Sequence, residues 1–322
     1  MVFFAEICCT LDNFILILIY LSLGFAMRRV PKFPTETPVV LNTFVMYVAL
    51  PALVLQKIPA LHFSWDLLIP ALVPWILLLL VSALILALGR LLHWSRDIIV
   101  ALLIVLPLGN TSFLGFPMIE ALFGGDWLPY AMIYDQVGSF VALATWSTIL
   151  AALYGTAQIG PDGRSQTAQK VSAAAMAMRI LTFPPFLALL AGLLLKSWTY
   201  PPLLQTTLDN LAGTLVPLIM FAVGFQLKFS LAGERLSPLL SGLGIKLLLM
   251  PLLVLTGAML LGLSGKAVQV SVFEAAMPPM ISAGAIAMMA GLAPRLVAAL
   301  VGFGLLLSFI TLPIWAWLLH QL

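Results

Sequence analysis

Charged side chains are scarce in this sequence: 15 Lys and Arg and 12 Asp and Glu among 322 residues, or 8% of the chain, against 62% hydrophobic residues. A soluble domain carries about 25% charged residues and needs them to stay dissolved. The composition therefore excludes a soluble enzyme and a disordered protein, and it predicts a polytopic membrane protein. The net charge of +3 is scattered along the chain, so we expect no nucleic-acid partner.

Cysteines and catalytic motifs are equally sparse. The two cysteines, Cys8 and Cys9, are adjacent, and vicinal cysteines rarely pair, so no disulfide framework is expected. The chain has no CxxC or HExxH motif and no Gly-Lys-Ser/Thr phosphate loop. We therefore expect no enzyme, no metal site and no bound cofactor, although a proton or sodium ion remains open as a coupling ion.

Ten apolar stretches, separated by polar or Gly/Pro-rich segments, predict membrane spans of about 20 residues each. They cover residues 13–27, 39–56, 67–92, 98–123, 128–154, 180–195, 203–226, 238–263, 267–291 and 295–320. The first stretch lacks a basic leading region and a small-residue cleavage site, so we interpret it as a retained helix.

The distribution of positive charge predicts the orientation of these spans. With the N-terminus outside, eleven of the 15 Lys and Arg residues fall in inside loops, three fall outside, and Lys246 lies within a span. Positive residues concentrate on the cytoplasmic side of membrane proteins. We therefore expect a multi-pass protein of the plasma (cell inner) membrane, embedded in the lipid bilayer with both termini outside.

A polar stretch, GTAQIGPDGRSQTAQK, divides the ten spans into two sets of five. We expect a first five-helix repeat over 1–155, a cytoplasmic linker over 156–176 and a second repeat over 177–322. An odd number of helices per half places the halves in opposite orientations, which is the inverted-repeat architecture of many secondary transporters. The predicted fold class is all-α integral membrane, with ten transmembrane helices arranged as two inverted five-helix repeats.

Two of the spans are interrupted at matching depth. Pro107-Leu108-Gly109-Asn110-Thr111 breaks the fourth span and Met277-Pro278-Pro279-Met280 breaks the ninth. Each break lies about ten residues into its helix, which is ~15 Å and half of a ~30 Å core. Simple proline kinks are the alternative. Two breaks at one depth in opposed halves favour crossed, broken helices 4 and 9 that line a polar cavity.

The residues of the first break also carry a family resemblance. Gly109-Asn110-Thr111-Ser112-Phe113-Leu114-Gly115-Phe116-Pro117 resembles the fourth-helix signature of the auxin efflux carrier family of membrane transporters. Further stretches are similar to its sixth, seventh, ninth and tenth helices: Phe183-Pro184-Pro185 with Gly192, Val216-Pro217 through Gly224 to Leu227, Ala276-Met277-Pro278-Pro279, and Leu307-Ser308 with Leu312-Pro313. The short linker is similar to that of the bacterial, malonate/malate permease-like branch.

The resemblance implies ten helices in two inverted repeats, alternating access between a scaffold part and a transport part, and in many members a homodimer. It also implies transport of small organic anions such as malonate, malate and indole-3-acetate. Ile281-Ser282-Ala283 follows the ninth-helix break, where the plant auxin exporters carry an Asn. This departure argues against auxin itself as the substrate.

Two helices that restart at the midplane direct their N-termini into one pocket. Helix N-termini carry unpaired N–H groups and a positive partial charge, so the arrangement predicts a site for a carboxylate. The expected substrate-binding residues are Pro107, Gly109, Asn110, Thr111, Ser112, Pro278, Pro279, Ser282 and, from the second span, Asn42. Packing or capping is the alternative role for Asn42, and for Asp209 and Asn210 of the seventh span.

Ionisable residues inside spans are candidates for ion coupling, because hydrocarbon holds them at a cost. Asp135, followed by Gln136, either exchanges a proton, attracts a cation, or only hydrogen-bonds a broken helix. Lys246 acts as a fixed charge in place of a sodium ion, pairs with Asp135 or Glu274, or extends its stem to the inner interface. Glu274 and Glu120 are expected nearer the outer surface, in solvated pairs.

The sequence thus predicts a secondary active carrier of a small organic anion, such as a dicarboxylate or weak aromatic acid. The main alternative is a cation/proton antiporter of related broken-helix fold, and a channel or receptor is a third. Such antiporters usually have carboxylates beside the crossover, whereas here both breaks are flanked by uncharged residues. The anion, the direction of transport and the coupling ion stay open.

Overall fold

A computed structural model describes residues 2–61, 64–155, 158–159, 165–166, 172–196, 198–227 and 236–322. Each of the ten predicted apolar stretches is helical over most of its described length. Among these residues, six helices are long and apolar enough to cross a bilayer: Thr37–Ala60, Trp65–Leu91, Gly125–Tyr154, Pro202–Gln226, Leu236–Leu260 and Pro294–Leu319. The pair α10 (Ala173–Leu181) and α11 (Pro184–Leu194), bent by 59°, is a seventh candidate.

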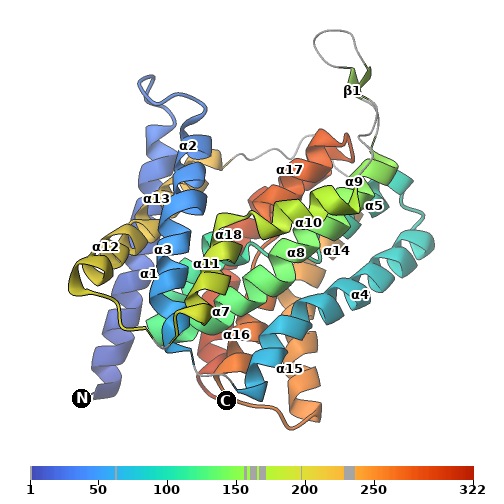
Figure 1. Ribbon diagram of the computed structural model, residues 1–322. Helices are drawn as coiled ribbons and strands as arrows, with labels where there is room; N and C mark the ends of the chain where they lie inside the picture. The colour runs from blue at the N-terminus through green and yellow to red at the C-terminus, as the bar shows by residue number, and fades with distance from the viewer. Residues whose placement is uncertain are drawn as a thin grey trace. The chain divides into compact units, whose positions relative to one another are not determined.

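The helices fall into two compact units (Figure 1). Unit 1 comprises Met1–Ser64, Ser112–Met132 and Leu181–Leu227. Its helices are α1 (Val2–Met27), α2 (Thr37–Phe44), α3 (Leu50–Lys57), α6 (Phe116–Leu122), most of α7 (Leu128–Ile133), α11, α12 (Pro202–Gly213) and α13 (Leu215–Gln226), with 3₁₀ turns at Ile58–Ala60 and Gly125–Trp127. Both predicted halves of the chain contribute to this unit.

Unit 2 comprises Trp65–Thr111, Ile133–Ile180 and Lys228–Leu322. Its helices are α4 (Leu68–Leu91), α5 (Arg96–Val105), α8 (Phe140–Ala142), α9 (Thr148–Tyr154), most of α10, α14 (Leu236–Gly244), α15 (Met250–Leu260), α16 (Lys266–Ala275), α17 (Ile281–Met289) and α18 (Pro294–Leu319), with a 3₁₀ turn at Trp65–Leu67. Both halves contribute here as well. The repeat relation between the halves 1–155 and 177–322 stays a prediction.

Two short strands depart from the all-α prediction. Within the described part of the linker, β1 (Gln158–Ile159) pairs antiparallel with β2 (Ser165–Gln166). Most of the rest of the predicted linker, 156–176, lies outside the described residues. Elsewhere in the described chain the regular structure is helical.

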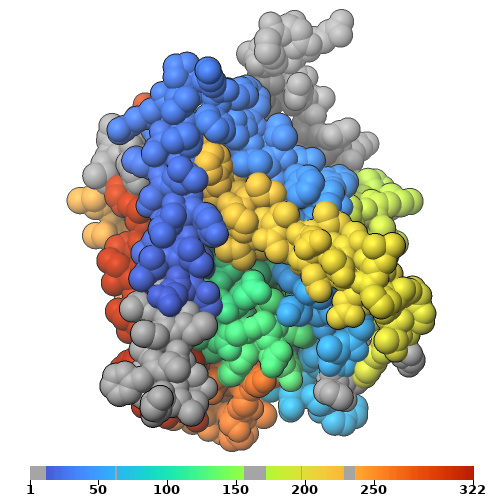
Figure 2. Space-filling model, turned by 90° about the vertical axis from the view of Figure 1, so that its left-hand side faces the viewer, coloured from blue at the N-terminus to red at the C-terminus, as the bar shows by residue number. Residues whose placement is uncertain are grey.

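Two glycines allow helices α1 and α13 of unit 1 to pack closely against each other. A Cβ added to Gly24 of α1 would lie 2.0 Å from the Phe221 carbonyl oxygen, and one added to Gly224 of α13 would lie 2.0 Å from the Leu21 carbonyl oxygen. Figure 2 shows α1 in blue lying against the gold segment of α13. Small residues permit this close backbone approach, which is typical of helix contacts in membranes.

Within the described part of the chain, five π-helical turns interrupt the spans. They are Val45–Ala49, Thr111–Gly115, Tyr134–Ser139, Leu143–Ser147 and Ile245–Leu249. Such turns are rare and occur frequently at functional sites, because they displace side chains and loosen backbone hydrogen bonds. Three of these turns carry residues that the sequence identifies as candidates for binding or coupling, namely Thr111, Asp135 with Gln136, and Lys246.

Candidate functional site: a crossover of two broken helices

Both predicted breaks are present. In the fourth span α5 ends at Val105 and helical structure resumes at Thr111. In the ninth span α16 ends at Ala275 and α17 begins at Ile281. Proline causes these ends, because it lacks an N–H and disfavours helical backbone in the residue before it.

The two breaks are hydrogen-bonded to each other. The Asn110 N–H donates to the Pro278 carbonyl at 2.8 Å, and the Met280 N–H donates to the Leu108 carbonyl at 3.1 Å. The exchange is reciprocal, with the first break donating to the second and the second to the first. The predicted meeting of the two interrupted helices is therefore confirmed within unit 2.

Gly109 permits this close approach. It forms an isolated antiparallel bridge with Pro279. A Cβ on Gly109 would lie 3.2 Å from the Glu274 carbonyl oxygen, 3.2 Å from the Met277 Cβ and 3.4 Å from the Lys246 Nζ. The missing side chain thus leaves room for the second break, and the ammonium group of Lys246 lies next to Gly109.

The break segments are buried, and one polar group there has no partner. Residues 106–111 and 271–280 are all buried, and Asn110 is 3% exposed. The Asn110 backbone N–H is used in the crossover, but its side-chain Nδ2 has no hydrogen-bond partner among the described residues. A buried donor without a partner costs about 1–3 kcal/mol, so this amide is available to a ligand.

Asp135 is held by two donors. The Thr111 hydroxyl donates to Asp135 Oδ1 at 2.5 Å, and the Gln136 amide donates to Asp135 Oδ2 at 2.8 Å. Trp75 of α4 steadies the π turn that carries Asp135, since its indole N–H donates to the Val137 carbonyl at 3.2 Å. The predicted link between Asp135 and a broken helix is therefore present.

Lys246 lies inside unit 2 with its charge buried. The residue is 1% exposed, so the alternative in which its stem reaches the inner interface is wrong. Its ammonium makes one hydrogen bond among the described residues, to the Met250 Sδ at 3.6 Å. Trp315 of α18 binds the same π turn, with its indole N–H donating to the Leu247 carbonyl at 3.0 Å.

Glu274 differs from its predicted surroundings. We expected it near the outer surface in a solvated pair, but it is 0% exposed, in the last turn of α16. Neither carboxylate oxygen has a hydrogen-bond partner among the described residues. The group is close enough to Asp135 and Lys246 to interact with both electrostatically. Its depth in the ninth span, similar to that of Asp135 in the fifth, is the sequence signal that identifies it as a candidate.

The remaining crossover residues are close to the breaks. Pro107, Pro278 and Pro279 are buried within them, whereas Ser282, in the first turn of α17, is half-buried. Ser112 is also half-buried and directly follows Thr111 in the chain, although it is counted with unit 1.

Asn42, Asp209 and Asn210 lie in unit 1. Asn42, in α2, is half-buried, and its Oδ1 has no partner among the described residues. Asp209 and Asn210 are exposed on α12. Asp209 accepts a hydrogen bond from the Gln56 amide at 2.6 Å. The structure therefore does not place these three residues in the unit that holds the crossover.

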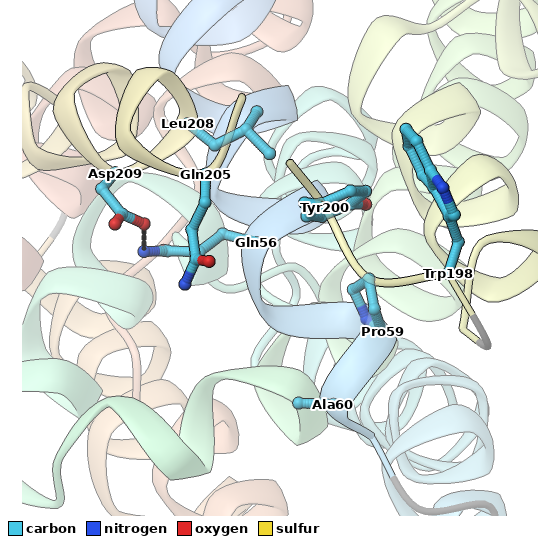
Figure 3. A pocket seen from close by; sticks show the side chains of 8 residues that line it. All are labelled: Gln56, Pro59, Ala60, Trp198, Tyr200, Gln205, Leu208 and Asp209. Carbon is cyan, nitrogen blue, oxygen red and sulfur yellow. Dashed lines mark hydrogen bonds between the residues drawn. The ribbon is translucent and has the colours of Figure 1, made fainter. Parts of the chain in front are cut away.

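Gln56 and Asp209 line a separate cavity of 260 Å³ in unit 1 (Figure 3). The rings of Trp198 and Tyr200 are 5.2 Å apart and edge to face. The Tyr200 hydroxyl donates to the Leu55 carbonyl at 3.1 Å, and burial raises the pKa of this phenol above its ordinary value. The cavity combines amide, carboxylate and aromatic groups without a cation in its lining.

These features describe a helical membrane protein with two broken helices whose breaks are hydrogen-bonded to each other. The family model for membrane transport proteins matches residues 10–316. The chain therefore belongs to this family, which is the auxin efflux carrier family of the resemblance described above. It is a multi-pass membrane transporter.

Two archaeal proteins are similar along nearly their whole length. An uncharacterized transporter of Methanothermobacter thermautotrophicus is 26% identical over 303 residues, which cover 93% of this chain and 95% of that protein. An uncharacterized transporter of Methanocaldococcus jannaschii is 24% identical over 324 residues, which cover 96% of this chain and 98% of that protein. Both names agree with a transport function and specify no substrate.

Proposed function

We propose that this protein is a secondary active carrier of a small organic anion, such as a dicarboxylate or a weak aromatic acid. The crossover supports the proposal: a buried ammonium, an amide donor without a partner and the start of α17 occur together within unit 2. Each of these groups attracts a carboxylate. An anion loses its hydration when it enters the membrane interior, and protein groups of this kind compensate for that loss.

The substrate carboxylate would be held by three kinds of donor. Asn110 would donate through its free Nδ2 group. The first N–H groups of α17, which begins at Ile281, point out of the helix and carry its positive partial charge, and Ser282 adds a hydroxyl in the same turn. Lys246 would supply the full positive charge. Thr111 and the prolines would position these donors, and Ser112 and Asn42 stay predicted ligands from unit 1.

Alternating access requires a part that moves and a part that does not. We propose unit 2 as the transport part, because it contains both breaks and all three coupling candidates, Asp135, Gln136 and Lys246. Unit 1 would be the scaffold. The number of spans supports two inverted five-helix repeats over ten spans. The distribution of positive charge supports a plasma-membrane location with both termini outside, and the family resemblance supports a homodimer.

We propose that Asp135 and Lys246 are the fixed charges of the coupling machinery. Asp135 accepts two hydrogen bonds, which favour its ionised form. A buried negative charge near a buried positive charge reduces the net charge that unit 2 would carry through the bilayer. Gln136 would keep the Asp135 carboxylate in place.

One observation favours the second candidate function, a cation/proton antiporter. The breaks have uncharged neighbours in sequence, but the structure brings two carboxylates to them, Asp135 through Thr111 and Glu274 through the last turn of α16. An antiporter would bind its cation between these carboxylates. Lys246, whose ammonium lies beside Gly109, would compete with that cation for both of them.

Uptake by proteoliposomes tests both candidates. The purified protein would be screened with radiolabelled malonate, malate and indole-3-acetate under imposed pH and sodium gradients, with protein-free liposomes as the control. The carrier predicts saturable uptake of at least one of these acids and exchange of labelled for unlabelled acid. Sodium or potassium movement against protons without any anion flux would instead establish the antiporter and refute the carrier.

A further inference from the structure

We propose, resting on the carrier function above, that Glu274 carries a proton that travels with the anion. Glu274 is ionised when the site is empty and protonated when the anion is bound. The substrate carboxylate then takes the place of the Glu274 carboxylate as the partner of Lys246.

The contrast between the two buried carboxylates supports this assignment. Asp135 accepts hydrogen bonds from Thr111 and Gln136, whereas both oxygens of Glu274 lack any hydrogen-bond partner among the described residues. Hydrogen-bond donors stabilise an ionised carboxylate, and burial without donors stabilises the neutral acid. Of the two groups, Glu274 is therefore the one that changes protonation more readily.

The charges that face Glu274 come from two neighbouring turns. Lys246, Asp135 and the phenol of Tyr134 interact with it electrostatically. Helices α15, α4 and α18 also pack against α16. Helix α15 has no titratable residue, and α4 and α18 carry Arg90 and Arg295 only in a terminal turn.

The buried charge is then the same in the empty and the loaded carrier. In the empty carrier, Lys246 is positive and Asp135 and Glu274 are negative. In the loaded carrier, Glu274 is neutral and the substrate carboxylate supplies the second negative charge. Without proton uptake, the bound anion would add a further negative charge in a low-dielectric site, where like charges repel strongly.

The proton step forms and later breaks one O–H bond on the Glu274 carboxyl group. A hydronium ion on the open side gives its proton to a Glu274 oxygen as the anion binds and becomes water. On the other side this O–H bond breaks, and a water molecule takes the proton as the anion leaves. Lys246 remains an ammonium throughout. One proton therefore accompanies each anion, one carboxylate of which takes the place beside Lys246.

Malonate in proteoliposomes tests the inference, because a dicarboxylate does not cross lipid unaided. With the membrane potential clamped at zero, a gradient of one pH unit, acidic outside, drives about tenfold accumulation at equilibrium for one proton per anion. We expect the parent to approach this value. We expect Glu274→Gln, fixed in the neutral form, to retain exchange of labelled for unlabelled malonate and to lose the pH-driven accumulation.

Glu120→Gln is the matched control. Glu120 is a half-buried glutamate of α6 with Lys57 as its electrostatic neighbour, and it lies in unit 1. This variant should accumulate malonate as the parent does. Accumulation by Glu274→Gln that equals the parent's overturns the inference and leaves the carrier function intact.

Two further measurements keep the outcome decisive. If Glu274→Gln does not fold, a pH dye enclosed in parent vesicles reports the coupling: malonate entry should acidify the lumen by one proton per anion, and entry without acidification refutes the inference. If the parent neither exchanges malonate nor any other acid of the screen, the carrier function fails, and the assignment of Glu274 fails with it.

Discussion

Replacing Gly109 by alanine probes the crossover with a single methyl group. The added Cβ would lie 3.2 Å from the Glu274 carbonyl oxygen, 3.2 Å from the Met277 Cβ and 3.4 Å from the Lys246 Nζ. Carbon atoms in good contact are ~3.5–4.0 Å apart, so the 3.2 Å approaches require the two breaks to shift by a few tenths of an ångström, whereas the ammonium is already at an ordinary contact distance. Overpacking of this kind costs about 1–3 kcal/mol.

The shift should weaken both the fold and the anion site. We expect a lower thermal midpoint in detergent and about a tenfold loss of anion affinity, which is ~1.4 kcal/mol. Gly257→Ala in α15 is the matched control, because a Cβ there meets nothing within 4 Å. It should be more stable than the parent by up to about 1 kcal/mol, since alanine favours helix over glycine. Gly109→Ala with the parent's midpoint and affinity would refute this account of the crossover.

Three further predictions follow from contacts within each unit. Trp315→Phe removes the donor to the Leu247 carbonyl, so we expect a loss of ~1–3 kcal/mol in stability; an unchanged midpoint would contradict it. Gly224→Ala drives a Cβ into the Leu21 carbonyl oxygen, so α1 and α13 must separate, and monodisperse protein should be strongly reduced on size-exclusion chromatography. Asp135→Asn weakens a buried, charge-assisted hydrogen-bond pair, and we expect about tenfold lower uptake with an altered pH profile; a profile identical to the parent's would remove Asp135 from coupling.

The breaks could be predicted from sequence because their causes are local. Pro107 and the pair Pro278-Pro279 cannot continue a helix, and counting residues along each span places both interruptions at one depth. The Asn110 N–H donates to the Pro278 carbonyl and the Met280 N–H donates to the Leu108 carbonyl, which confirms that the breaks meet.

The surroundings of Glu274 could not be predicted in the same way. Depth along a span follows from counting, but burial depends on which helices cover the residue. Helices α15 and α18 lie near α16 in the sequence, whereas α4, which also packs against it, comes from a distant part of the chain. The burial of Lys246 could not be predicted for the same reason. Its long stem is equally compatible with the interface and with the interior until its neighbours are known.

The two compact units and the π turns also depend on distant contacts. Unit 1 joins α1 to α13 through Gly24 and Gly224, which lie in different halves of the sequence. The π turns that carry Asp135 and Lys246 are steadied by Trp75 and Trp315 from other helices. No local sequence pattern predicts such turns, since the partner of the displaced carbonyl is remote.

Direct binding of a labelled anion to purified Asn110→Ala tests the central claim, that the crossed breaks hold the carboxylate. The parent and the variant would be compared by scintillation proximity with whichever acid the transport screen identifies, and Gln205→Ala in the separate cavity of unit 1 is the control. We predict that Asn110→Ala remains folded in the membrane and loses at least about tenfold in affinity, with the control unchanged. Binding by Asn110→Ala at the parent's affinity would contradict the account.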